Sequence, residues 1–377
     1  MASICGSPVC AGGKPKLKFT YTGDYVVRKD GVVELLTSGT IVFLEPKVID
    51  VFMVGGGSSG VSVTPGSVYG SPGGNGGGSG GYTRTIRRIA VQKNANIPVT
   101  IGAGGIAPDT DTSAPGGSSS WGTYSVNGGL STADTSKSGA GRNGGSGGGS
   151  GARDTSTMGT GGSDGGNGTT STYEGGKGQG ITTREFGEPN GKLYAAGGGG
   201  GTFINSTSPV YALGGTGGGG AGGWCGGTSE RIQAAGAGMA NTGSGGGGGV
   251  HSGRSPSWAV HGGSGGSGIV CFRDAQELPE LAGTWVLNER LYAPENAFYE
   301  NISFTVKTET GGETPTNRVD ITASILKVTL TGAGSVKVYT FTDDSWGSKY
   351  KYWTFSTGAT ASDEFRAWLA NNATKQA

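Results

Sequence analysis

Glycine dominates this chain and restricts what it can fold into. It supplies 83 of the 377 residues, about three times its usual share. Each ordered glycine loses more backbone entropy than any other residue and brings no side chain to a core. An ordered fold therefore has to replace much of its side-chain packing by contacts and hydrogen bonds between backbones.

The glycines gather in tracts between residues 55 and 268, separated by short inserts that carry aromatic and charged residues. The tracts lie near Gly116 and at Gly144–Gly151, Gly161–Gly168, Gly197–Gly201, Gly214–Gly223, Gly245–Gly249 and Gly262–Gly268. A strict Gly-X-Y repeat is absent, which excludes collagen. We expect the tracts to pack side by side as polyproline II-type helices, because only glycine fits where such helices meet. Disorder is the alternative that the composition leaves open.

Strand patterns precede and interrupt these tracts. Alternating or continuously apolar runs predict strands at 17–21, 25–29, 32–36, 40–44, 48–54, 82–91, 97–101 and 270–273. Asp30-Gly31 between two β-branched runs predicts a hairpin with a type I′ turn. We therefore expect a mainly β glycine-rich domain over residues 17–273, with a β unit at 17–103 and a glycine-helix bundle at 104–273. Residues 1–16 are small and polar, and we interpret them as a leader or attachment arm.

A second domain of ordinary composition is expected over residues 284–377. Alternating runs predict antiparallel strands at 284–288, 302–306, 319–323, 326–330, 336–341 and 351–355. One helix is expected at 361–371, since Phe365, Trp368 and Leu369 share a face at helical spacing. The predicted domain is thus a small antiparallel β fold with one C-terminal helix.

The charge balance argues against two classes of partner. The chain has 28 basic and 27 acidic residues, a formal net charge of +1. This balance removes the electrostatic attraction to nucleic acid or to an anionic membrane. No run approaches 18 apolar residues and no signal peptide is recognisable, so we expect no membrane insertion.

Motifs for catalysis are weak, and we expect no enzyme, no cofactor and no metal. Gly262-x-Ser264-x-Gly266 fits a nucleophile elbow in letters only, because no strand-turn-helix pattern surrounds it. Glu185 and Glu188 are an acidic pair of the kind that glycosidases use, but a salt-bridge role is favoured for them.

Four cysteines are too few for a disulfide framework in a chain of this length. They are Cys5, Cys10, Cys225 and Cys271. Free thiols are favoured, with a local disulfide or a metal site at the closely spaced N-terminal pair as alternatives.

The inserts between the tracts carry the candidate binding residues. Turns held by a rigid scaffold often bind ligands, and aromatic rings offer large contact areas that suit sugars. The candidates are Trp121, Tyr124, Tyr173, Trp224, His251, Trp258 and His261. The alternative for each is that it covers the side-chain-poor bundle as an apolar cap.

Several non-glycine motifs resemble one family of proteins. They are Phe19–Tyr25, Val51–Gly57, Gly80–Thr83, Val99–Gly105, Thr182–Glu188, Leu193–Gly197 and Gly265–Val270. Together they resemble the glycine-rich domain of phage tail fibres and tail-tip adhesins, over roughly residues 17–273. The C-terminal part, through Gly283–Glu289 and Ser362–Leu369, resembles a module of phage structural proteins.

The resemblance implies a function that the residues alone do not give. It implies an adhesin of a virion tail, assembled in the host cytoplasm, that binds a carbohydrate or protein receptor on the host cell surface and other tail proteins. The oligomeric state stays open between a homotrimer and a single-copy tip protein. A purely structural fibre or decoration protein is the main alternative, and a polysaccharide-trimming enzyme is the third class considered.

Overall fold

A computed structural model describes most of the chain, which forms two compact units, Met1–Ala275 and Gln276–Ala377. In the first unit the structure describes residues 17–63, 73–132, 139–152, 159–161, 166–172, 174–175, 183–188, 190–204, 212–226, 232–251 and 259–275; in the second it describes only strands. The fold is mainly β, as the sequence predicts, and the described residues contain one short 3-10 helix, η1 (Glu185–Gly187). None of the described helices could cross a membrane.

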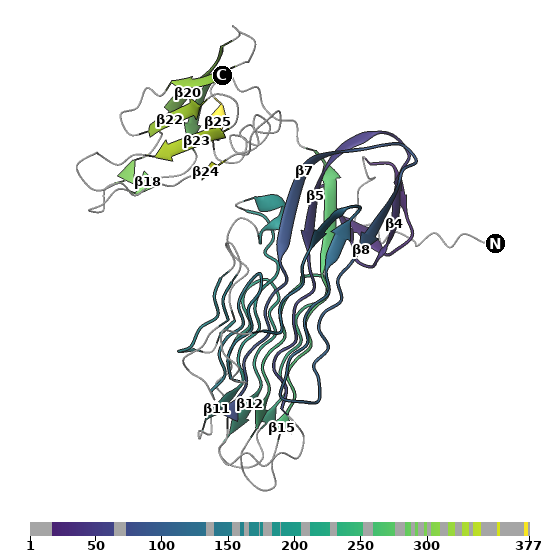
Figure 1. The fold of residues 1–377 in the computed structure, drawn as a ribbon, viewed down its shortest axis with the longest axis vertical. Helices are drawn as coiled ribbons and strands as arrows, with labels where there is room; N and C mark the ends of the chain where they lie inside the picture. The colour runs from purple at the N-terminus through teal and green to yellow at the C-terminus, as the bar shows by residue number, and fades with distance from the viewer. Residues whose placement is uncertain are drawn as a thin grey trace, which may run out of the picture. The chain divides into compact units, whose positions relative to one another are not determined.

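Two five-stranded antiparallel sheets begin the first unit (Figure 1). The first sheet has the order β1 (Phe19–Tyr21), β4 (Gly39–Phe43), β8 (Asn96–Thr100), β9 (Ser119–Trp121) and β10 (Tyr124–Val126). The second has the order β2 (Tyr25–Val27), β3 (Val33–Leu35), β16 (Ile269–Asp274), β5 (Lys47–Val54) and β7 (Thr83–Val91). The strands predicted between residues 17 and 101, and the one at 270–273, are confirmed by these elements.

The two sheets pack face to face, and their strand periodicity fixes which side chains meet. Along β16, Val270 and Phe272 enter the core between the sheets, whereas Ile269 and Cys271 point to the opposite face. Successive residues of a strand alternate between faces, so every second residue reaches each core. The second sheet therefore buries both of its faces, which explains why β5 is almost entirely apolar.

The hairpin between β2 and β3 is confirmed, but its turn is not type I′. Only Gly31 in this turn has a positive φ, of 86°, and its N–H donates to the carbonyl of Arg28. A type I′ turn needs positive φ at both central residues, and Asp30 does not have it. Asp30 instead uses its carboxylate to accept the N–H of Val32 and to pair with Arg28, which favours the longer loop.

Beyond the sheets the glycine tracts run side by side toward the far end of the first unit, where β11, β12 and β15 lie (Figure 1). Their backbone hydrogen bonds repeat every three residues. In residues 55–62, positions 55, 58 and 61 donate to tract 76–82, positions 56, 59 and 62 donate to tract 112–117, and positions 57 and 60 donate to tract 263–266. One tract therefore bonds to three neighbours in rotation, which a flat sheet cannot do.

At their glycine positions the tracts approach so closely that a side chain would collide with the neighbouring backbone. A Cβ atom added to Gly60 would lie 1.9 Å from the carbonyl oxygen of Gly247, and one added to Gly247 would lie 1.8 Å from that of Ala221. These distances are far below van der Waals contact. The high glycine content is thus a packing requirement of this region.

Short strands tie the tracts together at the far end. β14 (Val250–His251) pairs with β6 (Gly73–Gly74) and β15 (Ala259–Val260), and β12 (Trp224–Gly226) pairs with β11 (Thr202–Ile204) and β13 (Ile232–Gln233). Tracts and strands alternate along the chain, since β5 leads directly into tract 55–63 and β16 follows the last tract. A boundary at residue 103/104 therefore does not separate a β unit from a bundle.

The described strands of the second unit form three further antiparallel sheets, which agrees with the predicted β character of residues 284–377. Their orders are β21-β20-β17-β25, β18-β19 and β22-β23-β24. The bounds are β17 Gly283–Leu287, β18 Leu291–Tyr292, β19 Phe298–Tyr299, β20 Ser303–Glu309, β21 Thr316–Asp320, β22 Leu326–Thr331, β23 Ser335–Thr340, β24 Trp353–Thr354 and β25 Ala373–Lys375. The predicted helix at 361–371 and the predicted arm at 1–16 lie outside the described residues.

The close packing predicts a large difference between two glycine substitutions. Gly247→Ala places a methyl group within a neighbouring backbone, so we expect a loss of about 2–3 kcal/mol in the free energy of unfolding. In the matched control Gly223→Ala, the new Cβ has no neighbour closer than 3.3 Å. That variant should lose less than about 1 kcal/mol in urea denaturation. Equal losses in the two variants would contradict the packing described here.

Candidate functional site

The candidate binding residues from the sequence are spread over the first unit. Trp121 lies on β9 with its ring centroid 5.4 Å from that of Phe272 and 6.4 Å from that of Phe43. It is 2% exposed, so its side chain belongs to the core between the sheets. Trp121 is therefore a packing residue, as in the alternative to a binding role.

Two further candidates are also buried. Trp224 on β12 and His251 on β14 are 3% and 2% exposed, and their strands are in contact at the far end of the tracts. The structure therefore brings these two elements together, but inside the fold. Tyr173 and Trp258 lie outside the described residues.

Tyr124 and His261 are the candidates with exposed side chains, and they lie at different ends of the unit. Tyr124 is on β10, where the guanidinium carbon of Arg84 lies 5.6 Å from its ring centroid. His261 follows β15, and its Nε2 lies 4.0 Å from Oδ1 of Asp109. The predicted residues thus do not form one surface among the described part of the chain.

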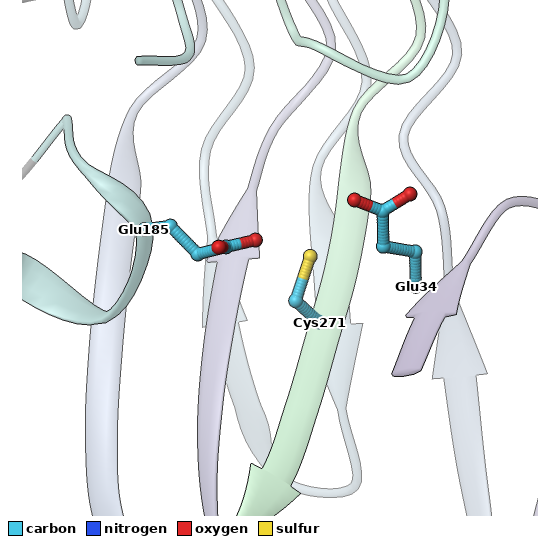
Figure 2. Close-up of side chains that lie close together, drawn as sticks. All are labelled: Glu34, Glu185 and Cys271. Atoms are coloured by element: carbon cyan, nitrogen blue, oxygen red, sulfur yellow. The ribbon is translucent and has the colours of Figure 1, made fainter. Parts of the chain in front are cut away.

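A cluster that the sequence analysis did not identify lies on the second sheet, on the face opposite the core between the sheets. Carboxylate oxygens of Glu34 and Glu185 and the sulfur of Cys271 lie within 4.8 Å of one another. They come from β3, η1 and β16, and Figure 2 shows the thiol between the two carboxylates. Strand alternation places Glu34 and Cys271 on this face, and η1 contacts the sheet through β5 and β7.

Arg28 and Tyr194 hold this cluster together. Arg28 Nη1 lies 2.8 Å from Glu185 Oε1 and 3.3 Å from Glu34 Oε1, and the Tyr194 hydroxyl donates to Glu185 at 3.2 Å. Burial opposes the charge of Arg28, but its hydrogen bonds to Asp30 and Glu185 outweigh this and raise the pKa of the guanidinium. Lys192 Nζ stands 4.8 Å from the Tyr194 ring centroid and 3.7 Å from Glu34.

A second ion network attaches the same insert to the sheet. Asp50 on β5 is 2% exposed and lies 3.4 Å from both Arg87 and Arg273. Its carboxylate also accepts the N–H of Arg88, whose φ is 57°, at a β-bulge in the pairing of β5 with β7. Arg273 continues to Glu188 at 2.6 Å.

The salt-bridge interpretation of Glu185 and Glu188 is therefore confirmed. Glu185 pairs with Arg28, and Glu188 pairs with Arg273. Their oxygens are used to fasten residues 183–194 over the sheet. This covering also buries Phe186 and Tyr194 against Phe52.

The three clustered side chains are of types that bind metals, but their surroundings favour a structural role. Burial, with the carboxylates of Glu185 and Glu34, raises the pKa of the Cys271 thiol well above its ordinary value of 9.0. The thiol is thus protonated at neutral pH, whereas a metal ligand is a thiolate. Arg28 already places a positive charge against both carboxylates. A cation would have to displace both the proton and the guanidinium.

Comparison with known families places this chain in a glycine-rich domain family. A family model described as a glycine-rich domain matches residues 37–274. This range runs from the residues before β4 to the last residue of β16, so it covers most of the described sheets and all of the glycine tracts. No curated protein matches the chain.

Removing the charge at the centre of the second network should be costly. We expect Asp50→Asn to lower the free energy of unfolding by about 3 kcal/mol, because two arginines lose their buried partner. Asp109→Asn is the control, since that side chain is 91% exposed and should change stability by less than about 0.5 kcal/mol. Denaturant titration of both variants measures the difference, and a loss as small as that of the control would contradict the buried pairing.

Alkaline pH should destabilise the first unit through its buried acids. The pKa of Cys271 is raised by burial, and that of Tyr21 is raised to about 12 by burial and by Asp24. At neutral pH both states keep these protons. As the pH rises through the ordinary pKa values of cysteine, 9.0, and tyrosine, 10.0, the unfolded chain loses them first, so the free energy of unfolding falls.

The Cys271→Ser variant removes one of these groups and should show a shallower fall between pH 8 and pH 11. Thermal or urea unfolding across this range provides the measurement. An identical slope in the variant would mean that Cys271 ionises equally in both states.

Proposed function

Since this chain belongs to the glycine-rich domain family, we propose that its body is a stiff spacer and that the protein is a non-enzymatic adhesin of a phage tail. The observation that carries this proposal is the rotating hydrogen-bond pattern of the tracts, which links a β-sandwich at one end to short strands at the other. Stiffness suits a part that must present a binding surface at a distance from its attachment. The proposed link to a virion rests on the motifs that resemble those of phage tail fibres and tail-tip adhesins.

The tracts are proposed to be polyproline II-type helices. Such helices have three residues per turn and no internal hydrogen bonds, so every N–H is available to a neighbour. The period of three in residues 55–62 supports this geometry. The exclusion of side chains by neighbouring backbones supports it as well.

An experimental structure at high resolution tests the helix type. The backbone of residues 245–249 should then show the φ and ψ angles of polyproline II, with the backbone turning once every three residues. The more extended φ and ψ angles of antiparallel β-structure in these residues would identify ordinary strands instead.

The receptor-binding face is proposed to lie at the far end of the tracts. Two antiparallel strand pairs, β12 with β13 and β14 with β15, lie at this end, and β12 contacts β14. His261, whose side chain is 41% exposed, is the partly exposed candidate among the described residues of this end. Tyr173 and Trp258 stay candidates, whereas the buried Trp121, Trp224 and His251 are assigned to packing.

Cell binding by two single variants tests which end reads the receptor. We expect His261→Ala to weaken binding of the purified chain to host cells by about tenfold, as for a residue at the centre of an interface. Tyr124→Ala, at the opposite end, serves as the control and should bind like the parent. The reverse result would place the receptor at the sheet end.

Absence of binding by a folded parent chain would favour the alternative function, a structural tail fibre or decoration protein. Release of sugars from host polysaccharide would point to the enzymatic class. Assays of binding to host cells, of sugar release from isolated polysaccharide and of incorporation into assembled particles therefore separate the three functions.

A further inference from the structure

One buried charge in the glycine tracts, that of Arg142, has no counter-charge among the residues that the structure describes. Arg142 lies in the tract at 139–151 and is 7% exposed. Its side chain makes one hydrogen bond within the described residues, from Nε to the hydroxyl of Ser113 at 3.0 Å. None of the ion pairs among those residues involves its guanidinium. By contrast, Arg28, Arg87 and Arg273, whose ion pairs are described above, each have a carboxylate within 3.4 Å.

A buried guanidinium with one neutral partner is energetically unfavourable. Burial of a charge without a partner costs several kcal/mol, and proteins normally offset it by pairing. Burial accordingly lowers the pKa of Arg142 to about 10, which still leaves it charged at neutral pH. The chain therefore keeps a cation at a place that disfavours one.

The surroundings of Arg142 hold it in a fixed position and supply further polar groups. Its N–H donates to the carbonyl of Gly77, and its own carbonyl accepts the N–H of Gly148, so the backbone is fixed on two sides. The hydroxyl of Ser113 accepts a hydrogen bond from Nε of Arg142 and donates one to the carbonyl of Ser131 at 3.2 Å. The two terminal nitrogens of the guanidinium make no hydrogen bond to the described residues. They do not belong to the fully enclosed polar atoms that lack a partner, so we treat them as the groups that meet a ligand.

We propose that Arg142, oriented by Ser113, is a binding site for an oxyanion group, a carboxylate or a sulfate or phosphate ester. A planar guanidinium presents two parallel N–H donors that match two oxygens of such a group. The anion supplies the counter-charge that none of the described residues provides. The identity of the ligand rests on the proposed attachment function, which makes it an acidic surface glycan. The site lies near the β6 end of the tracts.

Anion titration of the purified full-length chain tests this site without cells. Thermal unfolding is followed at constant ionic strength while chloride is replaced by acetate, inorganic phosphate or sulfate. We expect at least one oxyanion to raise the melting temperature of the parent chain. In Arg142→Gln its apparent affinity should fall by about tenfold or more, as expected when a charge-assisted hydrogen bond is lost.

Two variants control for changes in charge and folding. Lys93→Gln removes an exposed cation and should keep the anion response of the parent. Ser113→Ala keeps the guanidinium but frees its Nε, and should weaken the response by less than Arg142→Gln does. It also keeps the proposal testable if Arg142→Gln does not fold.

Polymers distinguish the source of the oxyanion. Polygalacturonate carries carboxylates, dextran sulfate carries sulfate esters, and dextran is neutral. Binding of a charged polymer that is lost in Arg142→Gln but kept in His261→Ala would support this site independently of the cell assay.

Two results would overturn the proposal. One is an equal response to all anions in the parent and Arg142→Gln. The other is a large loss of stability of Arg142→Gln in the absence of oxyanions, because this would mean that the chain itself pairs the guanidinium.

Discussion

Hydrogen bonding between glycine backbones is the interaction on which the rest of this structure depends. The N–H groups of one tract are shared among three neighbours in turn, so the tracts form a body in which backbone replaces the usual side-chain core. Only glycine permits the approach, as the 1.9 Å between a Cβ at Gly60 and the Gly247 carbonyl shows. The entropy lost by ordering glycine is offset in part by the backbone hydrogen bonds between the tracts.

The β-sandwich contains the strands at which the first tract begins and the last tract ends. β5 leads into the first tract and β16 receives the last one, and the two strands pair with each other along their length. The start and the end of the tract region are therefore fixed side by side. Residues 183–188 and 190–194 cover the outer face of that pair through Phe186, Tyr194 and the ion pairs of Glu185 and Glu188. Glu185 also belongs to the cluster of metal-binding residue types, in which Arg28 pairs with both carboxylates.

The sequence predicts local structure well where a periodic pattern carries it. The strands that became β5, β7 and β16 were visible as apolar or alternating runs, because their burial follows strand geometry. The hairpin β9–β10 was missed, because Trp121 and Tyr124 stand among glycine and serine and show too short a pattern. The meeting of Glu34, Glu185 and Cys271 depends on sheet order, which no local pattern encodes. For the same reason Trp121 looked like a loop aromatic, although its strand turns it into the core.

Amide hydrogen exchange of the chain labelled with ¹⁵N-glycine tests the backbone-packed body most directly. The glycine N–H groups of residues 55–60, 77–81 and 245–249 donate to neighbouring tracts, so their exchange should require opening of the whole body. We predict slow exchange with similar protection for the glycines of these three segments. Exchange at the rate of an unfolded chain in these tracts, with protection confined to the sheets, would contradict the account.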